Sequence, residues 1–297
     1  MINKANSRAY SVLILANIIY ATSYVATRLA LNGMPPATLA FVRLLIAGIV
    51  MLPLIWGAEN VAFQKKDHGL IACMGIFGFG AAFLLANFGL AASTATNAAL
   101  LIVVEPVSLM FLGPALLGER LLSYEIFGAL IAVGGSVFVV FNGVPGLSAH
   151  ILPHWRGDAL LALSGLAYAS YSLIGRPVLE RLPVERVTVL SIFWGAAAMF
   201  PFAVRELVKG QRPIWSWSML SGTLYLALIV TALGFLMWNW ALKRVEASRA
   251  GIFLNIQPVA GALLATLLLK ERLSVFVISG GLLSVMGLLI AFRPGKR

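Results

Sequence analysis

Long apolar runs follow one another along almost the whole chain, separated by short polar links. Each run has about 20 residues, the length that an α-helix needs to cross the ~30 Å hydrocarbon core of a bilayer. Strands of a membrane β-barrel are about ten residues long and alternate apolar with polar positions, and the runs have neither property. The pattern therefore predicts an all-α integral membrane protein of ten transmembrane helices, at residues 9–30, 37–56, 69–91, 95–117, 124–141, 157–175, 185–204, 217–241, 248–269 and 275–292.

The composition supports the same class. Of the 297 residues, 60% are hydrophobic and 11% are charged, whereas a soluble domain is about half apolar and a quarter charged. The longest links, 57–68 and 142–156, are too short to hold a soluble domain. The first apolar run exceeds the core of a removable signal peptide, about 7–15 residues, so we expect it to be retained as the first span.

The basic residues divide unequally between the two sets of links. With both termini in the cytoplasm, fourteen Lys and Arg residues lie inside and seven outside, as the positive-inside rule requires. The net charge of +11 then faces anionic lipid. Since the basic residues form no continuous stripe with aromatic ones, we expect no nucleic-acid partner. The sequence predicts a multi-pass protein of the cell (inner) membrane with cytoplasmic termini.

The chain also contains an internal repeat. A shift of 152 residues superposes 83–141 on 235–293 without a gap, and a shift of 148 relates 20–54 more weakly to 168–202. Shared apolar composition does not explain why prolines, glycines and a charged tripeptide agree. These agreements are Pro106 with Pro258, Gly128 with Gly280, and Glu119-Arg120-Leu121 with Glu271-Arg272-Leu273.

Each half of the repeat contains five predicted helices. Because five is odd, the second half enters the membrane from the opposite side, which makes the repeat inverted. Inverted repeats are typical of secondary transporters, whose substrate site lies near the bilayer midplane where the halves meet. We expect a first repeat at 1–141, a connecting loop at 142–156 and a second repeat at 157–297, arranged around a central cavity.

Both halves carry the same order of features near their ends. A Pro-bearing fourth helix is followed by Gly118-Glu119-Arg120-Leu121 or Lys270-Glu271-Arg272-Leu273, and then by a Gly-containing helix. In this respect the whole chain resembles the drug/metabolite transporter (DMT) superfamily, specifically its EamA-type ten-helix members. The resemblance implies transport and suggests the bacterial aromatic amino acid exporters as the nearest branch, although the motif says little about substrate. We interpret the motif itself as structural, because it recurs on opposite membrane faces.

Two ionisable residues lie deep in the predicted helices. Arg43 is about six residues into the second helix and Glu105 about ten into the fourth, hence roughly 9 and 15 Å from the same surface. Their repeat mates are Ser191 and Gln257, so the second half lacks both charges. We therefore expect Arg43 and Glu105 to contact each other. Whether such a pair locks two helices together or acts on substrate or protons stays open.

Polar and aromatic side chains recur at helical spacing on several spans, where lipid-facing helices have no need of them. We expect them to line the cavity and bind substrate. The candidates are Asn17, Tyr20, Tyr24, Arg43, Phe79, Phe83, Asn87, Glu105, Ser164, Tyr168, Tyr171, Trp238, Asn239, Asn255 and Gln257. Pro106 and Pro258 should kink the fourth and ninth helices, since proline removes a backbone hydrogen bond. They are the candidate hinges.

Enzyme chemistry has little support in the sequence. The three histidines lie in links, the chain has one cysteine, and no Gly-rich phosphate loop occurs. We therefore expect no catalytic residue, metal, cofactor or nucleotide. The favoured function is secondary transport that exports small metabolites, above all aromatic and hydrophobic amino acids, by alternating access. A gated channel or facilitator for another small solute, and a non-transporting membrane assembly protein, are the alternatives. The exact substrate, proton coupling, flux direction and oligomeric state stay open.

Overall fold

The computed structural model describes residues 4–117, 123–141, 154–245, 250–251, 253–254, 256–271 and 274–291. All regular elements in these ranges are helices, so the all-α prediction is confirmed there. The first part contains α1 (Lys4–Leu31), α2 (Pro36–Met51), α3 (Pro53–Gly57), α4 (Lys65–Cys73), the π-helix η1 (Met74–Ala81), α5 (Ala82–Ala91), α6 (Ala95–Leu101), α7 (Val104–Leu117) and α8 (Ser123–Phe141). The second contains α9 (Trp155–Arg181), α10 (Val184–Val208), α11 (Trp217–Tyr225), the π-helix η2 (Leu226–Gly234), α12 (Phe235–Leu242), α14 (Ile256–Leu269) and α15 (Val275–Ala291).

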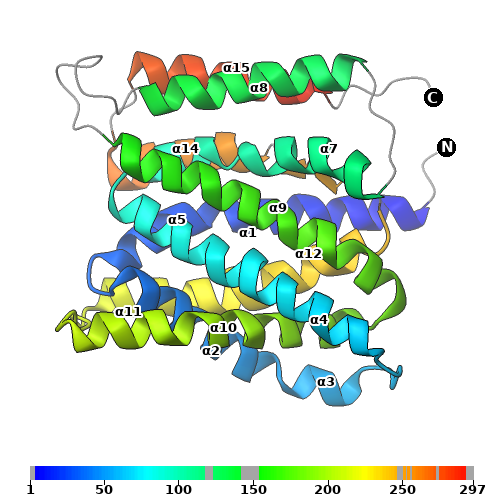
Figure 1. The fold of residues 1–297 in the computed structure, drawn as a ribbon. Coiled ribbons are helices and arrows are strands. Elements are labelled where there is room, and N and C mark those ends of the chain that lie inside the picture. Colours follow the sequence, from blue (N-terminus) through cyan, green and yellow to red (C-terminus); the bar gives the residue numbers. More distant parts are fainter. Residues whose placement is uncertain are drawn as a thin grey trace.

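The helices run side by side across Figure 1, and α1 begins at the end of the bundle where α15 ends. Within the described residues, six helical stretches are long and apolar enough to cross a membrane, and two shorter apolar helices follow them. The six are Arg8–Leu31, Pro36–Gly57, Lys65–Ala91, Ala95–Gly113, Val184–Val208 and Trp217–Leu242. The chain is therefore a multi-pass membrane protein. The total of ten spans stays a prediction.

The outer surface of the bundle is strongly apolar. Large side chains such as Leu116, Leu267 and Val275 are 67%, 73% and 79% exposed. A soluble protein rarely shows so much contiguous apolar surface. In lipid the same surface carries no penalty, because the acyl chains are as apolar as the side chains.

Helices α2 and α10, which the repeat relates to each other, lie side by side in opposite directions. At one end, the Glu206 carboxylate near the end of α10 accepts hydrogen bonds from the Ala37 and Thr38 amides at the start of α2, at 2.9 and 2.7 Å. Further along, Gly48 lies so close to the Phe193 ring that a Cβ at this position would be 3.0 Å from it. The amides at a helix start have no partner within their own helix, so Glu206 satisfies two of them.

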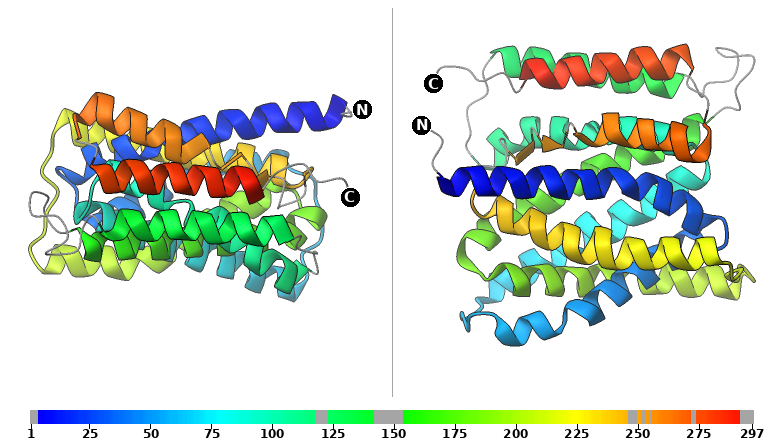
Figure 2. Two further views of the ribbon diagram at one scale, coloured as in Figure 1. Left: turned by 90° about the horizontal axis from the view of Figure 1, so that it is seen from above. Right: turned by 180° about the vertical axis from the view of Figure 1, so that it is seen from behind.

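Helices α8 and α15 form a second antiparallel pair between equivalent elements, set at one edge of the bundle (Figures 1 and 2). A Cβ on Gly135 of α8 would overlap Ser284 and the Gly280 carbonyl oxygen of α15. In the same way, a Cβ on Gly287 of α15 would overlap Gly128 and Ala132 of α8. The shift of 152 relates Gly135 to Gly287, Gly128 to Gly280 and Ala132 to Ser284, so the two contacts are equivalent. The two helices therefore pack against each other through the same small positions. Small residues allow the close backbone approach by which helices associate in lipid.

Two π-helical segments interrupt the third and eighth apolar runs. The shift of 152 carries residues 74–81 of η1 onto 226–233 of η2, so both interruptions fall at equivalent positions. A π-helix is rare and is found mostly at functional sites. Here η1 packs against α9 and α10, and η2 packs against α1 and α2. The π segments therefore change the helix register in the middle of the bundle.

The fourth predicted membrane helix, 95–117, is interrupted just before Pro106. It ends as α6 at Leu101 and restarts as α7 at Val104, and the Glu105 amide bonds the Ile102 carbonyl at 2.8 Å. Before Pro258, the Gln257 amide bonds the Leu254 carbonyl at 3.0 Å in the same manner. Proline lacks the amide that would continue an α-helical ladder, so the preceding turn tightens. The expected disturbance at Pro106 is present, while its use as a hinge stays a prediction.

We expect Gly135→Ala to destabilise the protein, because the added methyl group collides with the backbone of α15. Overpacking of this kind costs about 1–3 kcal/mol. Gly134→Ala is the matched control, since a Cβ at Gly134 meets nothing within 4 Å. Thermal unfolding of both purified variants in detergent, followed by tryptophan fluorescence, measures the difference. Equal unfolding temperatures for the two variants would contradict the observed α8–α15 contact.

Candidate functional site

A pocket with about 90 Å³ of accessible space lies inside the bundle, lined by helices from both halves of the chain. Its lining combines aromatic rings, hydroxyl and amide groups, one carboxyl group and one guanidinium group. Its residues are Tyr20, Ser23, Tyr24, Thr27, Arg43, Phe83, Ala86, Asn87, Leu90, Ala98, Ile102, Glu105, Leu161, Ser164, Tyr168, Tyr171, Ser172, Val230, Phe235, Trp238, Leu254 and Gln257. Concave, mostly apolar sites with a few polar groups are typical of small-molecule binding.

Eleven of the fifteen residues expected from the sequence line this pocket, so the helix-face analysis located the cavity. Asn17, Phe79 and Asn239 do not line it, although all three are buried. They lie behind the lining and position its side chains. Asn255 lies outside the described residues. That these residues bind a substrate stays a prediction.

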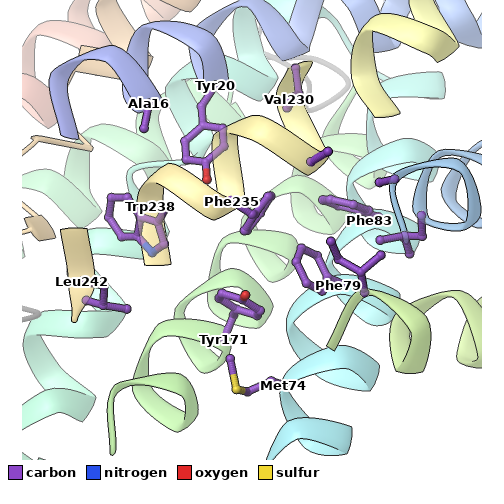
Figure 3. Packing of buried hydrophobic residues seen from close by; sticks show 14 of the residues in the cluster. Ala16, Tyr20, Met74, Phe79, Phe83, Tyr171, Val230, Phe235, Trp238 and Leu242 are labelled. Atoms are coloured by element: carbon purple, nitrogen blue, oxygen red, sulfur yellow. The ribbon is translucent and has the colours of Figure 1, made fainter. Parts of the chain in front are cut away.

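The aromatic cluster of the pocket consists of seven rings in continuous contact, from α1, η1, α5, α9 and α12. Figure 3 labels all of them except Tyr168. Phe79 and Phe235 have ring centroids 4.6 Å apart, and Tyr20 lies 5.2 Å from Phe235. Phe83 and Phe235, which the repeat relates to each other, are 6.3 Å apart. The two halves therefore meet at this cluster, whose members are Tyr20, Phe79, Phe83, Tyr168, Tyr171, Phe235 and Trp238.

A chain of hydrogen bonds joins α1 to α14 beside the pocket. The Tyr24 hydroxyl donates to Gln257 Oε1 at 3.0 Å, and Gln257 Nε2 donates to Asn17 Oδ1 at 2.8 Å. Asn17 Nδ2 in turn donates to the Leu13 carbonyl at 2.8 Å. Asn17 is fully buried, so its amide depends on these partners. The chain fixes the orientation of Tyr24 in the pocket wall.

Asn239 plays the corresponding part for Tyr171. Its side-chain nitrogen donates to the Tyr171 hydroxyl at 2.6 Å and to Thr188 Oγ1 at 2.8 Å. Tyr171 is 1% exposed and its ring packs against Phe79 at 4.7 Å. Thus a polar partner behind the lining holds this ring in place, as a buried tyrosine hydroxyl requires.

The expected contact between Arg43 and Glu105 is wrong. The Arg43 guanidinium donates from Nε and Nη2 to Thr231 Oγ1 of η2, at 3.0 and 2.9 Å. Its Cζ lies 3.9 Å from the centroid of the Phe83 ring. The ion pairs of the described chain do not include Glu105. Arg43 pairs instead with Thr231, whose repeat mate is the apolar Phe79.

Glu105 is 9% exposed and lines the pocket. Within the described part of the chain, its carboxyl group has no hydrogen-bond or ion-pair partner. An ionised carboxylate without a partner is costly away from water. The group is therefore available to a proton or to a ligand in the pocket.

The list of expected cavity residues leaves out two important ones. Phe235 is central to the aromatic cluster, and its equivalence to Phe83 was a sufficient signal. Thr231 has no sequence signal, because its role depends on the π-helical turn of η2 that presents its hydroxyl to Arg43. Small lining residues such as Ala86 and Ala98 also lack a signal, because they contribute space instead of chemistry.

Two arginines at equivalent positions of the repeat donate hydrogen bonds to carbonyl oxygens at the C-terminal ends of α5 and α12. Arg28 Nη1 donates to the carbonyl oxygens of Leu90 and Ser93, at 2.8 and 3.1 Å. Arg176, its repeat mate, donates to the carbonyl oxygens of Leu242 and Val245, which are the mates of Leu90 and Ser93. The final carbonyls of a helix have no partner within that helix, and a cation satisfies them.

Further hydrogen bonds hold the link between α5 and α6 and the first turn of α6. The Glu271 carboxylate accepts from the Ala95 and Thr96 amides at 2.9 and 2.8 Å, at the first turn of α6. Asp158 of α9 accepts from the Ser93 hydroxyl and, at 3.1 Å, from the Asn97 amide nitrogen. Glu271 belongs to the repeated Glu-Arg-Leu motif, so this member of the motif caps a helix. Glu119, Arg120, Leu121, Arg272 and Leu273 lie outside the described residues.

Fold and pocket together define a polytopic membrane protein with a polar, aromatic cavity lined by both halves of the chain. The sequence model of the EamA-like transporter family matches residues 7–141 and again residues 155–293. The chain belongs to this family of membrane transporters, which confirms the resemblance drawn from the repeated motifs.

Relatives of similar length agree with this assignment. The chain is 27% identical over 290 residues to a "Probable terminal-alkyne amino-acid exporter" of Streptantibioticus cattleyicolor, with 97% of this chain and 94% of the relative covered. It is 24% identical over 284 residues to a "Probable amino-acid metabolite efflux pump" of Escherichia coli, with 93% and 92% covered. A protein of known crystal structure matches with a TM-score of 0.69 at 21% identity, covering 96% of each chain. This last similarity establishes the fold alone.

We expect Gln257→Leu to destabilise the protein, because Asn17 loses its donor and Tyr24 its acceptor in a buried setting. Leaving buried polar groups unpaired costs about 1–3 kcal/mol each. Gln211→Leu, at an exposed position, is the matched control and should change stability by less than about 0.5 kcal/mol. Thermal unfolding in detergent compares the two. A Gln257 variant as stable as the control would show that the Tyr24–Gln257–Asn17 chain contributes nothing.

Proposed function

We propose that this protein exports amino acids with aromatic or other apolar side chains across the cell (inner) membrane. The pocket carries the proposal. Its aromatic cluster suits an apolar side chain, and its guanidinium and carboxyl groups are of the kinds that recognise the two charges of an amino acid. The printed names of two relatives, an amino-acid exporter and an amino-acid metabolite efflux pump, support the same substrate class.

The proposed architecture is ten membrane helices in two inverted halves, 1–141 and 157–297, joined by 142–156, with both termini in the cytoplasm. The double match to one family supports the division into halves. The antiparallel pairing of α2 with α10 and of α8 with α15 supports the inversion, since equivalent helices of an inverted repeat run in opposite directions. Equivalent π-helical segments η1 and η2 give further support.

We propose alternating access as the mechanism, since an inverted repeat supplies two similar halves facing opposite sides of the membrane. The interruptions before Pro106 and Pro258 are the proposed hinges. Ala98 and Glu105 line the pocket on either side of the first interruption, and Leu254 and Gln257 lie at the second. A change of helix bend at these points would therefore move the pocket wall. Arg28 and Arg176 hold helix ends at positions that the repeat places on opposite faces.

Glu105 gives the transporter a means of coupling to protons. Its carboxyl group lines the pocket and has no partner among the described residues, so it can take up a proton from one side and release it to the other. Arg43, which would have neutralised it in an ion pair, donates its hydrogen bonds to Thr231 instead. We therefore propose exchange of an amino acid for a proton in preference to facilitated diffusion.

Reconstituted liposomes test the transport function. Vesicles preloaded with unlabelled L-phenylalanine should transiently accumulate labelled L-phenylalanine by counterflow, and the uptake rate should saturate. Counterflow requires a site exposed to one side at a time, so a channel does not produce it. Absence of counterflow with L-phenylalanine, L-tyrosine, L-tryptophan and L-leucine would overturn the proposal.

We expect Glu105→Gln to abolish coupling to a pH gradient, because the amide cannot carry a proton. Uptake of labelled L-phenylalanine driven by an imposed pH gradient should fall roughly tenfold, within the usual range of coupling between two sites. Counterflow without a gradient should continue. Glu59→Gln, an exposed carboxyl group outside the pocket, should behave as the wild type. Full gradient-driven uptake by the Glu105 variant would exclude the proton role.

A further inference from the structure

The pocket contains a positive charge that forms no ion pair with the residues that the structure describes. Of the residues that line the pocket, Arg43 is the basic one and Glu105 the acidic one, and the structure does not pair them. Arg43 is 4% exposed. Its hydrogen bonds end on the neutral hydroxyl of Thr231, and its face rests on the uncharged ring of Phe83. These contacts hold the guanidinium in place without supplying a negative charge.

A structural role alone explains this arrangement poorly. A buried cation costs several kcal/mol unless a counter-ion accompanies it, and a simple helix contact does not need one. The repeat provides the comparison. α2 meets η2 through Arg43 and Thr231, whose mates Ser191 and Phe79 lie on α10 and η1. There the two helices approach at glycines, since a Cβ on Gly75 would overlap the Ser191 carbonyl oxygen and a Cβ on Gly195 would lie 2.7 Å from Phe79 Cβ. That second contact is close and carries no charge, so the scaffold alone does not require an arginine.

The geometry leaves one edge of the guanidinium free. Nε and Nη2 both point at Thr231 Oγ1, while the Nη1 hydrogens and the second Nη2 hydrogen remain. An arginine has five N–H donors in a rigid planar fork, and two parallel donors match the two oxygens of a carboxylate. Because Thr231 and Phe83 fix the plane of the group, little side-chain entropy is lost on binding.

We propose that Arg43 binds the carboxylate of the transported amino acid, with Thr231 as the residue that positions it. The inference rests on the proposed function and deepens it by assigning one residue to one substrate group. It makes the pocket selective for carboxylate-bearing molecules over amines with the same apolar side chain. The aromatic cluster contacts both kinds of molecule equally, so Arg43 determines the difference.

The test compares L-phenylalanine with phenethylamine, which lacks only the carboxylate. Each probe is titrated against the purified protein in detergent, and the concentration that gives half of the maximal thermal stabilisation is recorded. In the wild type, this concentration should be roughly 10- to 100-fold lower for L-phenylalanine, the range for a hydrogen bond to a charged group. Arg43→Gln should bring the ratio of the two concentrations close to one.

Three further variants make the outcome specific. Arg43→Lys keeps the charge but not the fork, so the ratio should be intermediate. Thr231→Val removes the acceptor that orients Arg43 and should lower the ratio, whereas Thr231→Ser keeps the hydroxyl and should preserve it. Size-exclusion chromatography before titration identifies the variants that fold. If Arg43→Gln does not fold, Arg43→Lys takes its place in the comparison.

The two levels of the proposal fail in different ways. If Arg43→Gln and Arg43→Lys keep the wild-type ratio, or weaken both probes equally, Arg43 does not bind the carboxylate, and the export function stands. If the wild type is not stabilised by L-phenylalanine and shows no counterflow with any of the four amino acids named above, the export function is overturned, and the assignment of Arg43 with it.

Discussion

Every polar group inside a lipid-embedded bundle must find its partner within the protein, because no water is present to replace it. Among the described residues, several buried polar side chains meet that requirement through contacts across the helices, whereas the Tyr20 hydroxyl and Asn239 Oδ1 have no hydrogen-bond partner. Asn17 and Gln257 bond each other over 240 positions of sequence, and Asn239 joins Tyr171 to Thr188. These bonds place the pocket walls, since each fixes a side chain of the lining or the residue directly behind it.

The same requirement explains the helix ends. Glu206 and Glu271 each satisfy two amides at the start of another helix. Arg28 and Arg176 satisfy the last carbonyls of α5 and α12. Charged residues near the ends of helices therefore join neighbouring elements, although exposed charges at a membrane surface contribute little. The fold is held at its ends by these contacts and in its middle by close packing at glycine, as at Gly135 and Gly287.

Much of this organisation could be predicted from the sequence because apolar run length and repeat spacing are one-dimensional properties. Tyr20, Tyr24 and Tyr168 were assigned to the cavity from helical spacing alone, and all three line the pocket. Register is different, since the π-helical turns of η1 and η2 have no clear sequence pattern. The turn in η2 presents Thr231 to Arg43, so the partner of Arg43 could not be predicted by counting along regular helices. Depth and the absence of both charges from the second half suggested Glu105 instead, which was wrong.

The proposed amino-acid substrate would give the departures from symmetry a physical reason. An inverted repeat creates two equivalent half-sites that meet at one place, here where Phe83 contacts its mate Phe235. An amino acid has no two-fold symmetry, since its carboxylate and its ammonium group are different ions. Two identical half-sites would offer it two equal cations or two equal anions, and each like-charged pair would be buried at high cost. With Arg43 and Glu105 in one half, and Ser191 and Gln257 in the other, the pocket avoids that repulsion and would offer the proposed ligand one orientation.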